Sequence, residues 1–82
     1  EGLYFGEEHH PLSPRVVRGE ALHGSNLFPS QVPEMTEAVL DWISMMTRLG
    51  HDLARLISLS LGLSADFLYR FYTRRPTTLF RI

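Results

Sequence analysis

The second half of the chain, residues 32–82, constrains the fold most, because it orders a long helix, a short helix and a strand-like run. From Pro33 onward apolar residues recur every three or four positions, which is the α-helical period. They are Val39, Ile43, Met46, Leu53, Ile57 and Leu61. Proline suits the first helical position, and Gly62 suits the left-handed position after a last turn. We therefore predict a long helix over residues 33–62.

The apolar stripe of this helix widens from Leu53 onward, where few polar residues interrupt it. We predict that the Leu53-Ile57-Leu61 face is the more buried end of the helix and that it packs against other protein. Gly50 costs about 1 kcal/mol relative to Ala inside a helix. We therefore expect another element to approach the helix closely at Gly50.

Residues 64–73 are expected to form a short second helix, with Ser64 as its N-cap and Arg75-Pro76 as its end. Its apolar side chains are predicted to pack in a core: Phe67, Leu68, Tyr69, Phe71 and Tyr72.

The last six residues, 77–82, alternate in the period-two pattern of a β-strand whose second face is mostly apolar. A single strand is not stable in water. We expect this strand to pair with the Leu3-Tyr4-Phe5 region or with another chain. A strand that comes last in the sequence also suggests that the chain is a piece of something larger.

Residues 1–32 are expected to be an irregular covering segment, because Pro11, Pro14 and Pro29 leave no room for a long helix. The segment is nevertheless too apolar for a disordered tail. The whole chain, 1–82, thus reads as a single segment that is mainly α with an irregular N-terminal half and a C-terminal strand, an α+β fragment.

Composition excludes several classes of function. The net charge is −1, which gives no electrostatic reason to expect nucleic acid or an anionic membrane as a partner. The chain has no cysteine, so disulfides and thiolate metal sites are excluded. No apolar run reaches the roughly 18 residues that span a bilayer, and no signal-peptide pattern is present. A cytoplasmic location is expected.

His9-His10 is the candidate metal-binding pair, with Glu7, Glu8 and His23 as the further options. Adjacent histidines diverge on most backbones, and no third ligand has a recognisable spacing. We favour solvated loop histidines.

Two other groups of residues were considered as sites. His51 and Asp52 are adjacent in the sequence, as in a catalytic His-Asp pair. Neighbours on a helix point about 100° apart, however, so we favour a surface histidine beside an unrelated aspartate. Four arginines form a basic cluster that could bind phosphate or carboxylate, although a solvated turn is the commoner reading; they are Arg70, Arg74, Arg75 and Arg81. The sequence shows no catalytic triad spacing or phosphate-binding loop.

Four stretches resemble, in this order, the N-terminal region of isopenicillin N synthase-like, Fe(II)- and 2-oxoglutarate-dependent oxygenases. They are residues 1–6, 22–29, 49–63 and 76–82. The phrase from Leu22 to Pro29 is similar to a His-Gly-x-Asn-Trp-Pro stretch of that family, with Phe28 where Trp is frequent.

The resemblance implies that the chain is the N-terminal helical segment of a double-stranded β-helix (jelly-roll) oxygenase, with the long helix along the outside of the barrel. It implies Fe(II) and 2-oxoglutarate as cofactors of the parent protein. The family binds iron through a His-x-Asp pair and a distant His, and no histidine here has Asp at the second position after it. No catalytic, cofactor-binding or metal-binding residue is therefore carried over. Tyr4, Phe5 and Arg81 are expected to line the substrate pocket.

Two functions of different classes follow. The first is a structural segment of an oxygenase, inactive alone, whose partner is the β-helix core of its parent. The second is a small helical interaction module whose apolar helix face binds a partner helix. Self-association through the terminal strand is a further option.

Overall fold

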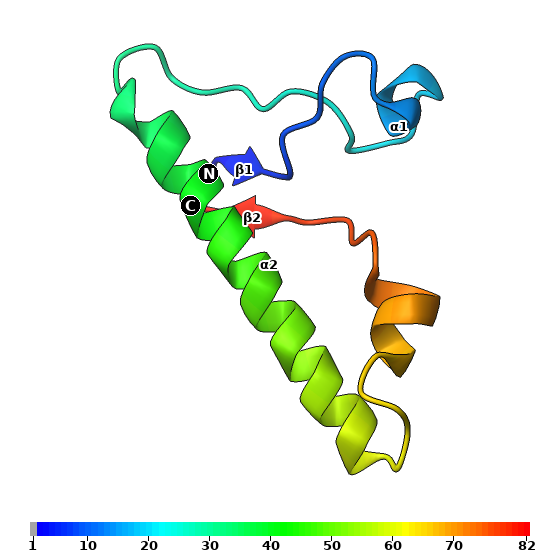
Figure 1. The fold of residues 1–82 in the computed structure, drawn as a ribbon. Helices are drawn as coiled ribbons and strands as arrows, with labels where there is room; N and C mark the ends of the chain where they lie inside the picture. Colours follow the sequence, from blue (N-terminus) through cyan, green and yellow to red (C-terminus); the bar gives the residue numbers. More distant parts are fainter. Residues whose placement is uncertain (1) are drawn as a thin grey trace. The chain divides into compact units, whose positions relative to one another are not determined.

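The computed structural model describes residues 2–82, and the chain divides into two compact units. The first unit holds residues up to Ile43 together with Thr77–Ile82, and the second holds Ser44–Pro76. The elements in chain order are β1 (Tyr4–Phe5), α1 (Pro14–Val17), α2 (Glu34–Ser60), η1 (Tyr69–Thr73) and β2 (Phe80–Arg81). Figure 1 traces this order, and α2 is the longest element. The chain is thus mainly helical with a small sheet, an α+β fragment.

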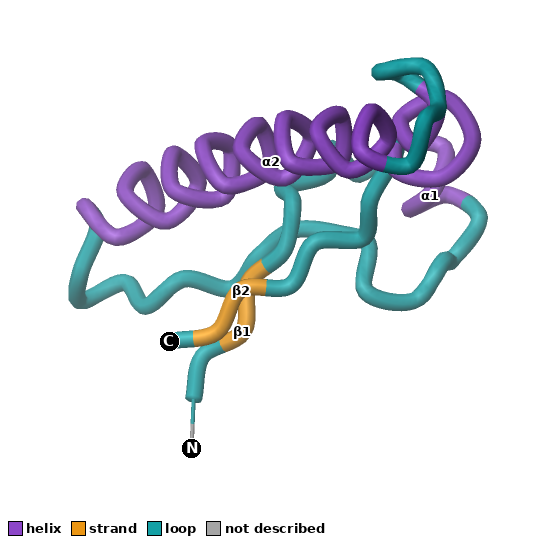
Figure 2. The backbone as a smooth tube through the Cα atoms, turned by 90° about the horizontal axis from the view of Figure 1, so that it is seen from below, coloured by secondary structure: helices purple, strands orange, loops and turns teal. Residues whose placement is uncertain are grey.

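The first unit is built around an antiparallel pair of short strands. Tyr4 lies opposite Arg81 and Phe5 lies opposite Phe80, so the two ends of the chain run side by side (Figure 2). Mutual backbone bonds between Leu3 and Ile82, at 3.0 and 2.9 Å, extend the ladder. The predicted pairing of the last strand with the Leu3-Tyr4-Phe5 region is confirmed. The regular strand is shorter than the expected residues 77–82.

The core of the first unit lies between this sheet and the first half of α2. Phe5 is 2% exposed and packs with the buried Val39 and Ile43. The Phe5 ring stacks on the Phe28 ring, with centroids 4.9 Å apart. Partly buried apolar side chains complete the cluster: Phe28, Met35 and Phe80. Residues 2–32 therefore do cover a core, although they contain β1 and the short helix α1.

The second unit closes with a regular C-cap at the end of α2. Gly62 has φ +77°. Its N–H donates to the carbonyl of Leu59 at 3.0 Å, and the N–H of Leu63 donates to that of Ser58 at 2.9 Å. This is the Schellman arrangement, in which a residue in the left-handed region lets the last carbonyls find donors. The role expected for Gly62 is confirmed.

The second helix is shorter than the predicted range 64–73. The structure has one π-helical turn, η1, and no side-chain cap at its start. Ser64 takes part through its backbone, because its carbonyl accepts the N–H of Phe67 at 3.1 Å. The predicted N-cap role of the Ser64 side chain is therefore not what the structure shows.

The predicted aromatic core is wrong for three residues of this turn, the first of which, Tyr69, is 40% exposed. Phe71 and Tyr72 are exposed. Their rings contact Phe67 at centroid distances of 4.9 and 6.4 Å. The three rings thus form a surface cluster, because a single helical turn offers too little surface to bury them.

The second unit covers a side of α2 other than the Leu53-Ile57-Leu61 face, whose predicted packing against other protein stays a prediction. Ala54 and Ser58 are buried, whereas Leu53, Ile57 and Leu61 are exposed within this chain. The Ser58 hydroxyl donates to the carbonyl of Ala54 at 3.0 Å and accepts the N–H of Leu68 at 3.3 Å. Small residues thus let the returning backbone approach α2. The expected close contact at Gly50 is wrong for the described residues, since an added Cβ would meet nothing within 4 Å there.

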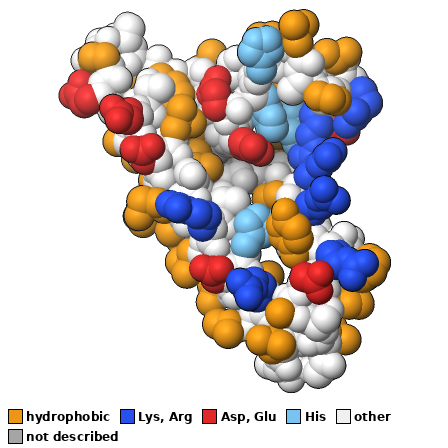
Figure 3. All heavy atoms as spheres, viewed as in Figure 1, with side chains coloured by type: hydrophobic (Ala, Val, Ile, Leu, Met, Phe, Trp, Pro, Cys, Tyr) orange, Lys and Arg blue, Asp and Glu red, His pale blue; other side chains and the backbone are white. Residues whose placement is uncertain are grey.

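Apolar side chains lie exposed along the second half of α2 (Figure 3). We call this set the apolar face; it comprises Met45, Met46, Leu49, Leu53, Leu56 and Ile57. Leu53, for example, is 51% exposed. Among residues 2–82, no helix combines the length and apolarity that crossing a bilayer requires.

Candidate functional site

Asn26 holds the end of β1 with a two-point hydrogen bond. Its Oδ1 accepts the N–H of Gly6 at 2.8 Å, and its Nδ2 donates to the carbonyl of the same residue at 2.8 Å. Glu8 completes the arrangement, because its Oε2 accepts from Nδ2 at 2.8 Å and from the backbone N–H of Asn26 at 3.1 Å. The side chain of Asn26 thus acts as a strand partner for Gly6 where the two-stranded sheet ends.

Two glycines leave the space that this arrangement needs. A Cβ on Gly6 would lie 3.0 Å from the carbonyl oxygen of Thr78. A Cβ on Gly2 would lie 2.6 Å from Nε of Arg81 and 3.0 Å from the carbonyl oxygen of Ile82. Glycine at these two positions therefore lets the chain around β1 lie close to the last residues of the chain.

Tyr4 and Arg81 form a cross-strand pair on the exposed side of the sheet. The Arg81 guanidinium carbon lies 5.4 Å from the centroid of the Tyr4 ring, within cation–π range. Phe5 points to the other side, into the core. Of the three residues expected to line a substrate pocket, two therefore share a surface and Phe5 packs against Phe28. The substrate-pocket role of Tyr4, Phe5 and Arg81 stays a prediction.

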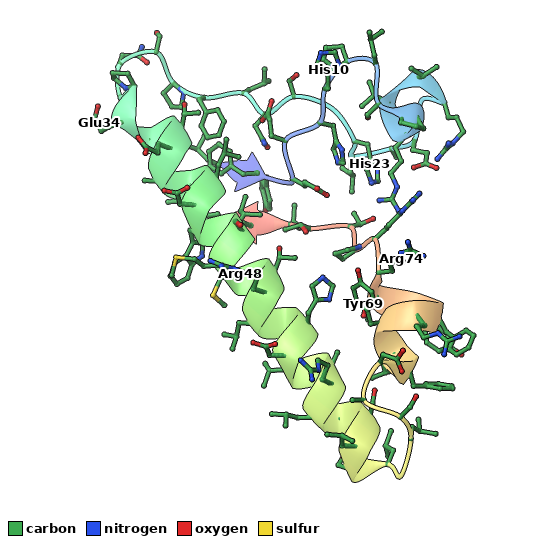
Figure 4. All side chains as sticks on the ribbon, in the orientation of Figure 1. His10, His23, Glu34, Arg48, Tyr69 and Arg74 are labelled. Atoms are coloured by element: carbon green, nitrogen blue, oxygen red, sulfur yellow. The ribbon has the colours of Figure 1, made fainter. Side chains whose placement is uncertain are left out.

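The histidines of the first unit are engaged with the backbone and with Arg15. Nδ1 of His10 accepts the N–H of Leu12 at 3.1 Å. Nε2 of His23 lies 2.9 Å from Nη1 of Arg15, and Nδ1 of His23 lies 2.7 Å from the carbonyl oxygen of Ala21. Both ring nitrogens of His23 are therefore occupied. Figure 4 shows His10 and His23 in the region around α1.

These contacts do not fit a metal centre built on His9-His10. The His9 ring lies beside the His23 ring, with centroids 5.1 Å apart, and its Nε2 is 3.9 Å from Oε2 of Glu7. Within the described part of the chain, no group of three or more His, Cys, Asp or Glu could hold a metal ion.

The remaining candidates fall in different units. The His51 ring meets the Tyr69 ring edge-on at 5.2 Å in the second unit, which gives this histidine a packing contact. Nε of Arg70 lies 3.9 Å from Oδ2 of Asp66, and Cζ of Arg70 lies 5.4 Å from the centroid of the Phe71 ring. Arg81 belongs to the first unit, whereas the other three arginines of the basic cluster belong to the second. An anion-binding role for that cluster stays a prediction.

Glu20 has a lowered pKa because of its contacts with Arg18. Arg18 donates to its Oε1 from Nη2 at 2.9 Å and from Nε at 3.3 Å. This hydrogen bonding lowers the pKa of Glu20, and the charges of Arg18 and Arg15 act in the same direction. The Glu20 side chain lies at the surface, so the effect is local.

Sequence reasoning missed the contacts of Asn26 and of Arg15. Asn26 lies inside the phrase that carries the family resemblance, so that phrase was the available signal. Arg15 and His23 are eight positions apart in an irregular segment, where no periodicity links them.

Comparison with known proteins adds one finding. The chain is 42% identical, over an 89-residue alignment, to a probable iron/ascorbate oxidoreductase of Dictyostelium discoideum. The alignment covers 100% of this chain and 24% of the relative. This chain is similar to part of an iron oxidoreductase. The match supports the resemblance to the iron-dependent oxygenases seen in the sequence, and the chain spans about a quarter of the length of this relative. No family model matches the chain.

Proposed function

We propose that this chain is the N-terminal structural segment of a non-haem, Fe(II)- and 2-oxoglutarate-dependent oxygenase of the isopenicillin N synthase-like type. The observation that carries the proposal is the 42% identity to a probable iron/ascorbate oxidoreductase that is about four times as long. The order of the matching sequence stretches supports the subfamily and the jelly-roll parent fold. On this proposal, the rest of the parent protein supplies the ligands of the iron and of 2-oxoglutarate.

The apolar face of α2 supports a structural role. Six large apolar side chains are half-exposed on one helix, and such a continuous apolar surface on a helix usually marks an interface. We propose that the jelly-roll core of the parent covers this face. Tyr4 and Arg81 would then reach the substrate from the sheet, while Phe5 anchors that sheet in the core of the first unit. The proposed location is the cytoplasm.

The proposal is tested on the full-length protein by hydrogen exchange and by turnover. Peptides that contain Leu49, Leu53 and Leu56 are expected to be strongly protected, because a buried helix face opens only with the whole fold. Succinate is expected to form from 2-oxoglutarate only when Fe(II) is present. Rapid exchange in these peptides and no Fe(II)-dependent succinate would contradict the proposal.

The same apolar face also suits the second function, a helical interaction module that binds a partner helix. The two functions differ in when the face becomes covered. A structural segment has a protected face in the isolated full-length protein. A module has an exposed face until a partner is added, so exchange measured with the purified protein alone separates them.

A further inference from the structure

The first unit contains His9, His10 and His23. His10 and His23 lie near α1 (Figure 4), and each accepts a hydrogen bond through a ring nitrogen. A ring nitrogen can accept only when it carries no proton, so each of these contacts requires a neutral ring. The proposed oxygenase function does not use these residues.

His23 shows the requirement most clearly. Its partner Arg15 has only donor groups, so Nε2 of His23, 2.9 Å from Nη1, must be the acceptor. Nδ1 then carries the proton and donates to the carbonyl of Ala21 at 2.7 Å. If Nε2 of His23 were protonated, its N–H would point at an N–H of Arg15. The positive imidazolium and the positive guanidinium would then lie 2.9 Å apart.

His10 is held in the same way by the turn before α1. The backbone N–H of Leu12 donates to its Nδ1 at 3.1 Å. The N–H of Ser13 donates to the carbonyl of His10 at 2.9 Å. Because a backbone N–H is a donor only, protonation of Nδ1 breaks the first of these bonds and loosens the turn.

The charges around His23 act in both directions. The Arg15 guanidinium, 2.9 Å from Nε2, opposes a positive charge on His23, and the His9 ring lies beside it with its centroid 5.1 Å away. Glu20, whose Oε2 is 3.5 Å from Nε of Arg15, favours that positive charge, and Arg18, paired with Glu20 at 2.9 Å, partly offsets the Glu20 charge. Glu7 lies beside His9, and Glu8 is bound to Asn26. Among these groups, Arg15 makes the shortest contact with His23 itself, so it dominates.

The turn between Glu20 and His23 also stores strain. Leu22 has φ +64°, a left-handed conformation that a leucine rarely adopts. Its side chain is 78% exposed, so packing does not hold it there. The hydrogen bonds of His23 to Ala21 and Arg15 flank the strained residue and keep the turn closed.

We propose that residues 9–24 form a pH-sensitive latch on the first unit, closed while His10 and His23 are neutral and opened when they are protonated. Opening relaxes Leu22 and frees α1 from the turn that follows it.

The first test uses the unchanged full-length protein. NMR of the imidazole nitrogens at about pH 8 is expected to show His23 with its proton on Nδ1 and His10 with its proton on Nε2. A His23 ring with its proton on Nε2, or a His10 ring with its proton on Nδ1, would overturn the proposal.

The second test follows amide exchange, corrected for the intrinsic effect of pH, from about pH 8 to about pH 5. The amides of Leu12, Arg18 and Gly19 are expected to lose about tenfold or more of their protection. The double variant His10→Asn, His23→Gln should lose little, because neutral amide oxygens accept the same bonds at any pH. A loss as large in this variant as in the wild type would overturn the proposal.

The matched control is His51→Gln, because His51 lies in the second unit, packed on Tyr69. This variant is expected to keep the wild-type pH dependence at Leu12, Arg18 and Gly19. If amide protection in His51→Gln did not change with pH, the pH dependence could not be assigned to His10 and His23. If the double variant does not fold, the tautomers of the wild type still decide.

Discussion

At the scale of single residues, Asn26 shapes the first unit because it completes the backbone hydrogen bonds of Gly6. Strand β1 ends at Phe5, and the next residue would otherwise present a free N–H and C=O. An asparagine side chain carries one acceptor and one donor group side by side, the same pattern as a peptide unit. Both contacts are 2.8 Å long. The residue type is therefore dictated by the geometry.

Replacing Asn26 by Asp tests whether the side-chain amide stabilises the fold, because it changes only the NH2 group of the side chain. The donor Nδ2 becomes an oxygen that faces the carbonyl of Gly6 and the carboxylate of Glu8, so we expect a loss of about 1–3 kcal/mol of unfolding free energy. Chemical denaturation of the full-length protein measures it. The neighbouring exposed Ser25→Ala change should cost less than about 0.5 kcal/mol. Equal, small effects of both changes would show that the Asn26 contacts contribute nothing.

The strain at Leu22 predicts a stabilising substitution. Asn tolerates the left-handed region, whereas a β-branched residue does not. Leu22→Asn is expected to raise the unfolding free energy by roughly 0.5–1 kcal/mol, and Leu22→Val to lower it. Thermal unfolding of both variants measures the order. A less stable Leu22→Asn variant would mean that the exposed leucine has a contact of its own in the full-length protein.

The lowered pKa of Glu20 predicts that its ion pair with Arg18 makes stability depend on pH. Its pKa is lowered in the folded chain, chiefly by Arg18. A lowered folded pKa means that the stabilisation is present above the unfolded pKa and is lost as pH falls through the folded pKa. In Arg18→Gln, the carboxyl titration of Glu20 followed by NMR should move upward. An unchanged titration would show that the ion pair is not populated in solution.

At the scale of elements, apolar spacing predicted α2 but not which of its sides the chain itself covers. The spacing rule counts large apolar residues, and these are the half-exposed ones in the second unit. The covered positions are Ala54 and the polar Ser58, which is 0% exposed. A serine reads as solvent-facing in a pattern, and its burial depends on the N–H of Leu68 reaching it. Apolar spacing along a helix cannot predict a hydrogen bond from a residue outside that helix.

The two short elements near the C-terminus show the same limit. Pairing of the last residues with Leu3-Tyr4-Phe5 could be predicted, because a strand needs a partner. The extent of the ladder could not, since β1 has only two residues and sets the length of β2. The start of η1 was placed too early because Ser64 takes part through its backbone carbonyl, which every residue has.

The apolar face of α2 gives the prediction for this scale. In the full-length protein, Leu53→Ala should cost about 2–5 kcal/mol, because the covered site would keep a cavity. Leu59→Ala is the matched control, since Leu59 lies about 120° away around the helix. It should cost less than about 1 kcal/mol. Equal melting temperatures for both variants and the wild type would show that the face is not covered.

At the scale of the whole molecule, the chain has two compact units and matches about a quarter of its relative. The order of four sequence stretches predicts an iron-dependent oxygenase, and the 42% identity to a probable iron/ascorbate oxidoreductase supports that prediction. The candidate site could be predicted only in part. Tyr4 and Arg81 do lie together, but the burial of Phe5 depends on stacking with Phe28, twenty-three positions away. Contacts across an irregular segment leave no periodic trace in a sequence.

The most direct test of the proposed function is Fe(II) binding by the full-length protein. Calorimetric titration without oxygen is expected to show a single tight Fe(II) site, which a His9→Ala, His10→Ala double variant retains, because the proposed ligands lie outside residues 1–82. Adding 2-oxoglutarate and oxygen to the loaded protein should then yield succinate. No tight Fe(II) site, or a site lost in the histidine double variant, would contradict the account.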